Sequence, residues 1–237
     1  MTPIQQLFLG VGASEKTYVD DLFSTYLYKG DGNTGRTVTN NIDFGEGGMV
    51  WTKERSGPMG AYHYLADTVR GITNYLIPSE NSASSDDSNR FTSVSSTGFT
   101  IGNEADINQS GDDYASWTFR KAPGFFDIVT YTGNNTSGRT VNHSLGCVPG
   151  CIIIKRTNGS ANWAVFHRNI DDDNFANYSL SLNEENARWG SSTIFNDTKP
   201  TSTQFTLGNN ERVNTNNDEY VAYVFAGGES TAATARS

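Results

Sequence analysis

The sequence predicts an all-β protein made of two tandem antiparallel β-sandwich domains, jelly-roll-like and related by internal duplication. The first observation behind this prediction is composition: aromatic residues make up 12% of the 237 residues, charged residues only 18%, and there are 24 glycines. Aromatic and β-branched side chains suit a pleated surface, and Gly and Asn suit turns with positive φ. The second observation is an ordered repeat, and the third is that short apolar runs alternate with Gly/Asn turns while helical periodicity is absent.

The repeat is domain-sized. Residues 23–30 (FSTYLYKG) return at residues 126–133 (FDIVTYTG), 103 residues later, and the offset has drifted only to 106 at the last matched pair. Ordered matches of this kind indicate duplication of one unit of about 100 residues. The further matched pairs are 35–38 with 138–141, 48–53 with 150–155, 75–77 with 178–180, 98–103 with 204–209, and 112–119 with 218–225.

This repeat divides the chain into four segments. We expect an N-terminal docking arm (1–21), a first β-sandwich repeat (22–121), a second β-sandwich repeat (125–228) and a C-terminal linker (229–237). Each repeat is long enough to bury its own core. The connection KAPG at 121–124 is short and contains a proline, so the two sandwiches are predicted to sit end to end with little freedom.

Within each repeat, the first two strands are predicted to form a hairpin, 26–28 with 36–38 and 129–131 with 139–141. The most apolar runs, 49–51 and 151–154, predict a central strand that is buried on both faces. Asn158 and Gly159 mark a tight turn before the next strand at 163–166.

Later strands show an alternating pattern. Tyr178, Leu180 and Leu182 alternate with serines, which predicts a half-exposed strand, and residues 205–207 alternate likewise. The last strand of each repeat, 114–119 and 220–225, has the clearest alternation. From these strands we expect four core side chains: Trp51, Ile153, Trp117 and Phe225.

The N-terminal arm is apolar and lies outside the repeat, with Ile4, Leu7, Phe8 and Leu9 as its candidate docking residues. Burying such side chains contributes roughly 1.5–3 kcal/mol each, so leaving them in water is unfavourable. Two alternatives remain at this stage: an extra edge strand of the first sandwich, or strand addition to a neighbouring subunit or docking partner.

Charge excludes some partners. The net charge is −9 and the pI is near 4.7, which argues against nucleic acid and against an anionic membrane surface as partners. No run of about 18 apolar residues exists, so no membrane insertion is expected. The N-terminus also lacks the basic region and cleavage site of a secretory signal.

Signatures of catalysis are missing. The chain has no G-x-S-x-G elbow, P-loop or G-x-G-x-x-G motif, and its three histidines have no metal-ligand spacing. A glycosidase can place two carboxylates anywhere in a sandwich, but Asp67 and Glu104 lack acidic counterparts in the second repeat. Cys147 and Cys151 correspond to Gly45 and Met49 of the first repeat, which has no cysteines at these positions, so we expect free thiols. We therefore predict no enzyme, no catalytic or metal-binding residues and no cofactor.

Two features leave alternatives open. The acidic runs 86–89 and 171–174 are either solvated loops or ligands for Ca²⁺, although neither has EF-hand spacing. Trp189, flanked by polar residues, is a candidate ligand contact that stacks on a sugar ring, or it folds back onto its own core.

Seven segments carry a resemblance to a known family: 26–30 (YLYKG), 47–53 (GGMVWTK), 67–71 (DTVRG) and 116–123 (SWTFRKAP), then 126–133 (FDIVTYTG), 148–150 (VPG) and 163–168 (WAVFHR). With these segments, the chain resembles a domain family found, often in tandem, in virion proteins of marine bacteriophages, including cyanophages. The resemblance covers most of residues 22–228 and brings no catalytic residues with it.

This resemblance implies a non-enzymatic virion structural protein, with the particle-proximal part of a tail fibre involved in host adsorption as the first expectation. The alternatives are a carbohydrate-binding module that recognises host glycans, and a capsid surface or decoration protein. The expected partners are other virion proteins (a tail adaptor, tail tube or capsid), further copies in a homo-oligomer with a trimer favoured, and a host surface glycan. The expected location is the virion, assembled in the host cytoplasm.

Overall fold

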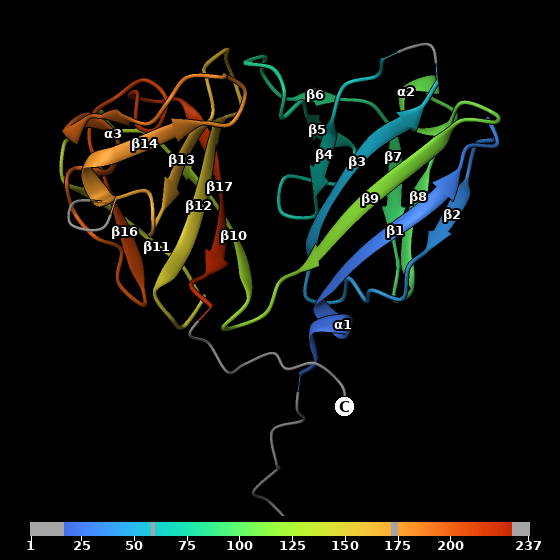
Figure 1. Cartoon of the computed structure of the whole chain (residues 1–237), viewed down its shortest axis with the longest axis horizontal. Coiled ribbons are helices and arrows are strands. Elements are labelled where there is room, and N and C mark those ends of the chain that lie inside the picture. The colour runs from blue at the N-terminus through green and yellow to red at the C-terminus, as the bar shows by residue number, and fades with distance from the viewer. Residues whose placement is uncertain (1–16, 58–59, 172–174, 229–237) are drawn as a thin grey trace, which may run out of the picture.

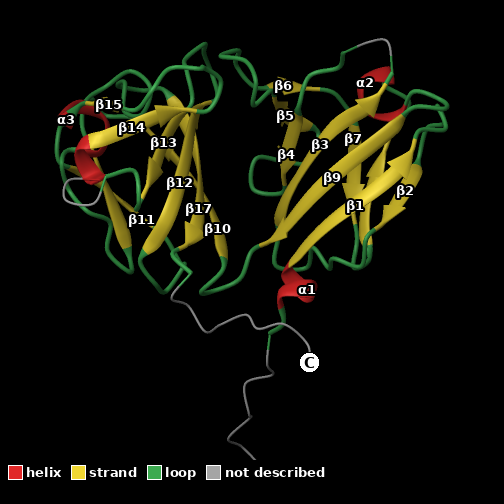
Figure 2. Cartoon of the chain, in the orientation of Figure 1, coloured by secondary structure: helices red, strands yellow, loops and turns green. Residues whose placement is uncertain are grey.

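Strands and the loops between them make up most of the chain, with only short helices (Figure 2). This computed structural model describes residues 17–57, 60–171 and 175–228. The four candidate arm residues and the C-terminal linker therefore lie outside the described residues. Antiparallel sheets build both halves, so the predicted all-β sandwich class is confirmed. Of the described helices, none is long and apolar enough to cross a bilayer.

The first half is a sandwich of a six-stranded sheet and a three-stranded sheet. The large sheet has the order β1 (Phe23–Lys29), β9 (Asp113–Arg120), β3 (Gly48–Ser56), β4 (Tyr64–Asp67), β5 (Asn74–Leu76) and β6 (Ser85–Asp86). The small sheet has the order β2 (Arg36–Thr39), β8 (Gly98–Ile101) and β7 (Phe91–Val94). Helix α1 (Val19–Leu22) precedes β1, and α2 (Ala105–Asn108) follows β8.

The second half has the same plan. Its large sheet has the order β10 (Phe126–Thr132), β17 (Glu219–Ala226), β12 (Pro149–Arg156), β13 (Ala164–His167), β14 (Tyr178–Ser181) and β15 (Trp189–Gly190). Its small sheet pairs β11 (Arg139–Asn142) with β16 (Gln204–Leu207). The 3-10 turn η2 (Phe175–Asn177) and helix α3 (Ser192–Phe195) lie in the loops.

The register of the strands also corresponds between the halves. Trp51 lies opposite Trp117 in the first large sheet, and Ile153 lies opposite Tyr223 in the second, as the offsets require. In the small sheets, β2 pairs with β8 as β11 pairs with β16. This correspondence is what duplication would produce, while duplication itself stays a prediction.

The predicted hairpins do not form. β1 pairs with β9 and β2 pairs with β8, so the connection from residue 30 to residue 35 crosses from the large sheet to the small one. The same crossing separates β10 from β11. The prediction was wrong because the Gly- and Asn-rich turn is held by a buried side chain of the distant helix α2 rather than by a partner strand.

That side chain is Asn108, which is completely buried. Its Oδ1 accepts the backbone N–H of Asp31 at 3.0 Å, and its Nδ2 donates to the carbonyls of Asn33 and Gly102 at 3.0 and 2.8 Å. Arg36 donates to the same Oδ1 and to the carbonyl of Lys29. Asn108 thus ties the crossing loop to the loop after β8.

Asn214 repeats this arrangement in the second half and is also completely buried. Its Oδ1 accepts from Asn134 and from Arg139, and its Nδ2 donates to the carbonyls of Thr136 and Gly208. The crossing loop itself runs tight against this region, because a Cβ on Gly133 would stand 1.9 Å from a backbone oxygen of Thr215. A glycine is therefore required where each first strand ends, as at Gly30.

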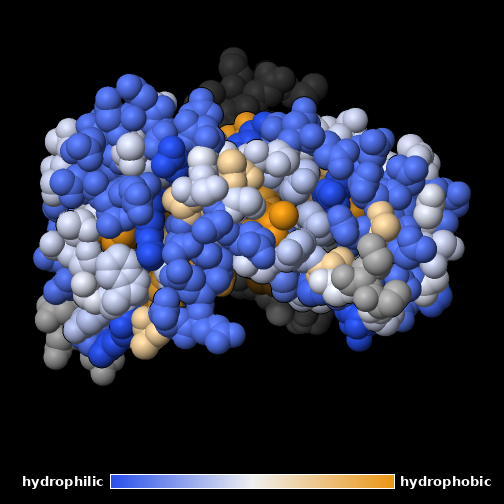
Figure 3. Space-filling view, turned by 90° about the horizontal axis from the view of Figure 1, so that it is seen from above, coloured by the Kyte–Doolittle hydropathy of each residue, from blue (hydrophilic) through white to orange (hydrophobic). Residues whose placement is uncertain are grey.

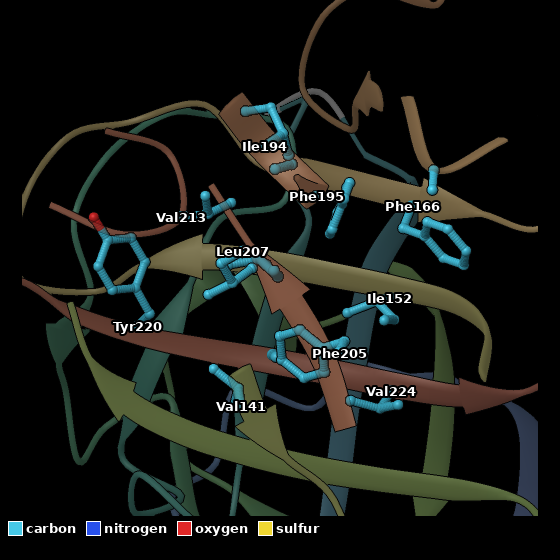
Figure 4. Packing of buried hydrophobic residues seen from close by; sticks show 14 of the residues in the cluster. Val141, Ile152, Phe166, Ile194, Phe195, Phe205, Leu207, Val213, Tyr220 and Val224 are labelled. Carbon is cyan, nitrogen blue, oxygen red and sulfur yellow. The ribbon is translucent and has the colours of Figure 1, made fainter. Parts of the chain in front are cut away.

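Each sandwich buries its own apolar core between its two sheets. In the second half, Ile152 and Val224 of the large sheet point toward Phe205 and Leu207 of the small sheet, and Phe195 of α3 closes the end (Figure 4). In the first half, the core includes Val50, Tyr64, Phe91, Phe99, Ile101 and Tyr114.

A third core lies between the halves, which stand side by side with their large sheets facing each other (Figure 1). Seen from above, hydrophobic residues show where the halves meet, within a surface that is mostly hydrophilic (Figure 3). The end-to-end prediction was therefore wrong. The third core joins Met49, Leu65 and Leu76 of the first half to Phe126, Ile128, Trp163, Val221 and Tyr223 of the second.

Because of this third core, strand β17 is apolar on both faces. Tyr220, Ala222 and Val224 point into the sandwich, whereas Val221 and Tyr223 point into the third core. The four side chains that we expected to be core all lie on the outward faces of the large sheets. Trp51, Ile153 and Phe225 pack against the third core, and Trp117 is half-buried beside Trp51.

Candidate functional site

A buried ion pair lies where the two halves meet. The Asp67 side chain at the end of β4 is completely buried, and its Oδ2 accepts from Arg70 Nε at 2.6 Å. The same oxygen accepts from the Tyr223 hydroxyl of the second half at 2.7 Å. Asp67 Oδ1 accepts the backbone N–H groups of Val69 and Arg70. A buried carboxylate is tolerated here because both of its oxygens accept hydrogen bonds and one of the donors is a guanidinium.

The Tyr223 hydroxyl remains a hydrogen-bond donor to Asp67 over the ordinary pH range. Burial raises its pKa well above the ordinary value, so the hydroxyl stays protonated in the folded protein. The Arg70 guanidinium donates to the Tyr223 oxygen at 3.3 Å. Tyr223 therefore links Asp67 and Arg70 of one sandwich to the large sheet of the other.

The Arg70 guanidinium also reaches the surface. It donates to Ser84 Oγ at 2.9 Å and to the carbonyl of Asn74 at 3.2 Å. With Asp67 and Tyr223, these contacts use four of the five N–H groups of the guanidinium among the described residues. One N–H is left for a bound group.

Arg70 lines a groove of about 440 Å³ between the sandwiches, which we call the inter-sandwich groove. One wall comes from the first half and the other from the upper ends of β10, β12 and β17 in the second half. Hydroxyls, an amide, a guanidinium and one carboxylate offer both donors and acceptors to a polar ligand. The lining residues are Arg70, Asn74, Ser84, Thr130, Tyr131, Thr132, Thr157, Glu219 and Tyr220.

The loop between β5 and β6 closes the groove from the first half. Ser84 donates its backbone N–H to the carbonyl of Thr157 at 2.8 Å, and Trp163 Nε1 donates to the carbonyl of Glu80 at 2.9 Å. The carbonyl of Asn81 accepts from the backbone of Ala161 and from Lys155 Nζ. These bonds hold the groove walls at a fixed separation.

Lys155 is an unusual group behind this loop because its side chain is completely buried and, in the described part of the chain, it forms no ion pair with a carboxylate. Its Nζ donates to the carbonyls of Arg156, Asn81 and Gly159 at 2.7, 3.3 and 3.5 Å. Burial, reinforced by the charges of Arg156 and Arg70, lowers the pKa of Lys155 to about 8.

Trp189 lies in β15, and its ring packs against the core of the second sandwich. The Arg212 guanidinium stacks on the ring, 5.0 Å from its centre. Trp189 does not line the inter-sandwich groove. The structure thus places Trp189 against its own core, and contact with a ligand stays a prediction.

The other candidate groups are used within the fold. His63 Nδ1 accepts from Trp51 Nε1 at 2.9 Å, and burial lowers the pKa of His143, whose Nε2 lies 3.2 Å from the carbonyl of Thr201. Cys147 and Cys151 are free thiols. Among the described residues, no group of three or more His, Cys, Asp or Glu side chains is placed to hold a metal ion.

Sequence reasoning missed the groove, although a signal was present. Asp67 and Arg70 have no equivalents in the second repeat, where His167 stands in the place of Asp67. A charged pair that only one copy keeps is expected to serve a contact that only that copy makes.

Comparison with known proteins gives one match. Residues 19–232 match the model of a family described as Domain of unknown function (DUF7483). The chain belongs to this family. DUF7483 spans both sandwiches and the inter-sandwich groove, from α1 to beyond β17. No curated protein and no solved structure matches the chain.

Proposed function

We propose that this chain is a non-enzymatic structural protein of a bacteriophage virion, acting as the particle-proximal part of a tail fibre in host adsorption. The observation that carries the proposal is the third apolar core, which joins the two sandwiches and limits movement between them. A structural component of a fibre needs a fixed arrangement of its domains, because a flexible linker would let the domains adopt many relative orientations.

The positions of the two chain ends and of the groove support attachment of the protein to the particle at one end. Helix α1 and the last residues of β17 lie at the same end of the molecule, beside the connection between the halves (Figure 1). The inter-sandwich groove is lined by Thr132 and Glu219, at the opposite ends of β10 and β17. An arm fixed to the particle would therefore leave the groove facing away from it.

Virion incorporation tests the proposal. We expect a variant that lacks residues 1–13 to stay soluble and to melt as the full chain does, but to be missing from purified virions. The full-length protein, labelled with an antibody and imaged by electron microscopy, is expected at the base of the tail fibres. A truncated protein that still enters virions, or a label elsewhere on the particle, would contradict the proposal.

A second candidate function is binding of host glycans in the inter-sandwich groove. The polar lining favours it, since sugar hydroxyls need matched donors and acceptors. We expect Thr132→Trp, which fills the groove at an exposed site, to abolish binding to a glycan array. The control is Thr140→Trp on β11, an exposed position away from the groove. Equal binding by both variants would remove the groove from consideration.

A further inference from the structure

Two carboxylates meet at one end of the first sandwich. Glu54 lies near the end of β3, and Asp112 directly precedes β9, the strand that pairs with β3. Both side chains face Gly57, because a Cβ on that glycine would collide with Glu54 Oε1 and would stand 2.6 Å from Asp112 Oδ2. The two acidic oxygens therefore share one small space beside an exposed glycine.

These carboxylates lack the partners that buried charges need. Glu54 is only 6% exposed, and its Oε2 accepts the backbone N–H of Ala61 at 2.8 Å. Among the described residues, nothing donates a hydrogen bond to the buried oxygens Glu54 Oε1 and Asp112 Oδ2. Within the same part of the chain, neither residue forms an ion pair. A buried, unpaired charge is costly, so this pair of carboxylates requires a positive counter-charge.

The second sandwich has an equivalent position with a different side chain. Arg156 in β12 holds the place of Glu54 in β3, because each lies opposite the second residue of the last strand of its sandwich. Asp218 likewise holds the place of Asp112. The backbone carbonyls of these two aspartates accept the N–H of the glycine that follows β10 and β1, respectively, both at 2.7 Å.

In the second sandwich, a guanidinium fills the space beside the glycine. Arg156 Nη2 donates to Asp218 Oδ1 at 2.9 Å. A Cβ on Gly159, the equivalent of Gly57, would stand 2.7 Å from the guanidinium carbon of Arg156. One sandwich thus places a positive charge of its own next to the aspartate, whereas the other places a second negative charge there.

The neighbouring cationic side chains do not neutralise the pair. Lys53 Nζ donates to two backbone carbonyls, and Arg55 is exposed and makes no ion pair with a described residue. Burial, reinforced by the negative charges of Glu54 and Asp112, raises the pKa of the Tyr114 hydroxyl to about 12. The surroundings therefore leave both negative charges in place.

We propose that Glu54 and Asp112 bind a hard divalent cation, Ca²⁺, beside Gly57. Both side chains offer oxygen ligands, which Ca²⁺ prefers, and its flexible coordination takes further ligands from backbone carbonyls and water. The site differs from the acidic runs 86–89 and 171–174, and it does not depend on the virion assignment. The sequence predicted no metal-binding residues because these two carboxylates are far apart in the chain and meet only through the pairing of β3 with β9.

Calorimetric titration and thermal melting of the full-length chain at pH 7 test the site. After removal of metal with EDTA and dialysis, we expect one Ca²⁺ to bind per chain. A hundredfold excess over the dissociation constant should raise the melting temperature by at least roughly 5 °C. Glu54→Gln should abolish both the binding and the rise. KCl at the same ionic strength should not reproduce the rise, because screening of surface charge does not fill a specific site.

Glu54→Arg is the sharpest variant because it copies the second sandwich. Its guanidinium should pair with Asp112, so the variant should melt in EDTA at or above the wild type and bind no Ca²⁺. Asp86→Asn, on the exposed strand β6, is the matched control and should bind Ca²⁺ as the wild type does. A wild-type chain that binds no Ca²⁺, a rise that KCl reproduces, or binding that survives in Glu54→Gln or Glu54→Arg would overturn the proposal.

Discussion

Asp67 is the residue at which the polar contact between the sandwiches is concentrated, with its side chain completely buried against Arg70 and Tyr223. We expect Asp67→Asn to lower the free energy of unfolding by roughly 3–5 kcal/mol, because it leaves the Arg70 charge buried without a counter-charge. Urea unfolding followed by tryptophan fluorescence measures this change. The substitution keeps the side-chain volume, so loss of packing does not contribute.

The matched control is Asp113→Asn. Asp113 pairs with Lys29 at 3.4 Å, and both side chains are at least half exposed. Such pairs contribute about 0–1 kcal/mol, so this variant should unfold close to the wild type. Equal losses in the two variants would mean that burial of the Asp67 pair is not what stabilises the contact.

Lys155 makes stability depend on pH. Its pKa is lowered to about 8 in the folded protein, so between pH 8 and its ordinary value the unfolded chain holds the proton that the folded chain has released. Unfolding then takes up a proton, and stability rises with pH. We expect a gain on the order of 1 kcal/mol between about pH 8 and 9.5. Above that range the buried tyrosines, which resist ionisation, oppose the gain.

Urea unfolding at several pH values measures this slope. Lys155→Met should flatten it, since Met has no proton to release. Lys53→Met, at the equivalent position of the first sandwich, is the control and should keep the wild-type slope because Lys155 is still present. A slope that survives Lys155→Met would assign the pH dependence to another group.

At the scale of elements, the buried asparagines hold the crossing loops. Asn108→Ala removes donors and acceptors for Asp31, Asn33 and Gly102 at once. Each buried group left unsatisfied costs about 1–3 kcal/mol, so we expect a loss of several kcal/mol. Asn214→Ala should cost a similar amount, because its contacts are equivalent. Thermal melting with a calorimeter tests both variants.

The control for the asparagine variants is Asn142→Ala on β11, where the side chain is exposed. It should melt within a few degrees of the wild type, as surface substitutions generally change stability by less than about 0.5 kcal/mol. A large loss in Asn108→Ala with none in Asn214→Ala would show that the two loops are not held in the same way.

These elements also show what sequence can and cannot predict. The turn and the return strand after residues 151–154 were predicted, because Asn158 and Gly159 sit between two apolar runs that pair directly. The prediction of a hairpin after β1 was wrong because Asn108, 72 residues beyond Arg36, holds the turn. The one available signal was that asparagine recurs after an aliphatic residue in both repeats, as Ile107–Asn108 and Val213–Asn214.

At the scale of the whole molecule, the repeat predicted the number of sandwiches but not how they pack. Alternation assigns the faces of a strand only when one face is polar. β9 and β17 have apolar residues on both faces, since each large sheet lies between two cores. For this reason the sequence could not show that Trp117, expected as a core residue, points away from its own sandwich. The inter-sandwich groove was missed with it, because a groove between two bodies depends on their packing.

The third core makes the second sandwich dependent on the first. Burial of Ile128, Val221 and Tyr223 contributes roughly 1.5–3 kcal/mol for each fully buried side chain. We therefore expect the full chain to melt in a single transition. Residues 125–228 alone should melt at least roughly 10 °C lower, since 1 kcal/mol shifts a domain of this size by about 4–8 °C. The exposed apolar face should also bind a hydrophobic dye.

A matched double variant distinguishes the effect of exposing the apolar face from any other loss of stability in the fragment. Ile128→Thr with Val221→Thr changes only side chains that point into the third core, and Thr25 already occupies the equivalent of Ile128 in the first sandwich. The fragment with both changes should stay folded and bind less dye than the unmodified fragment. In the full chain, the same changes should lower the melting temperature because they weaken the contact between the halves. If the unmodified fragment melts as the full chain does and binds no dye, the third core does not contribute to stability, and the two sandwiches fold independently.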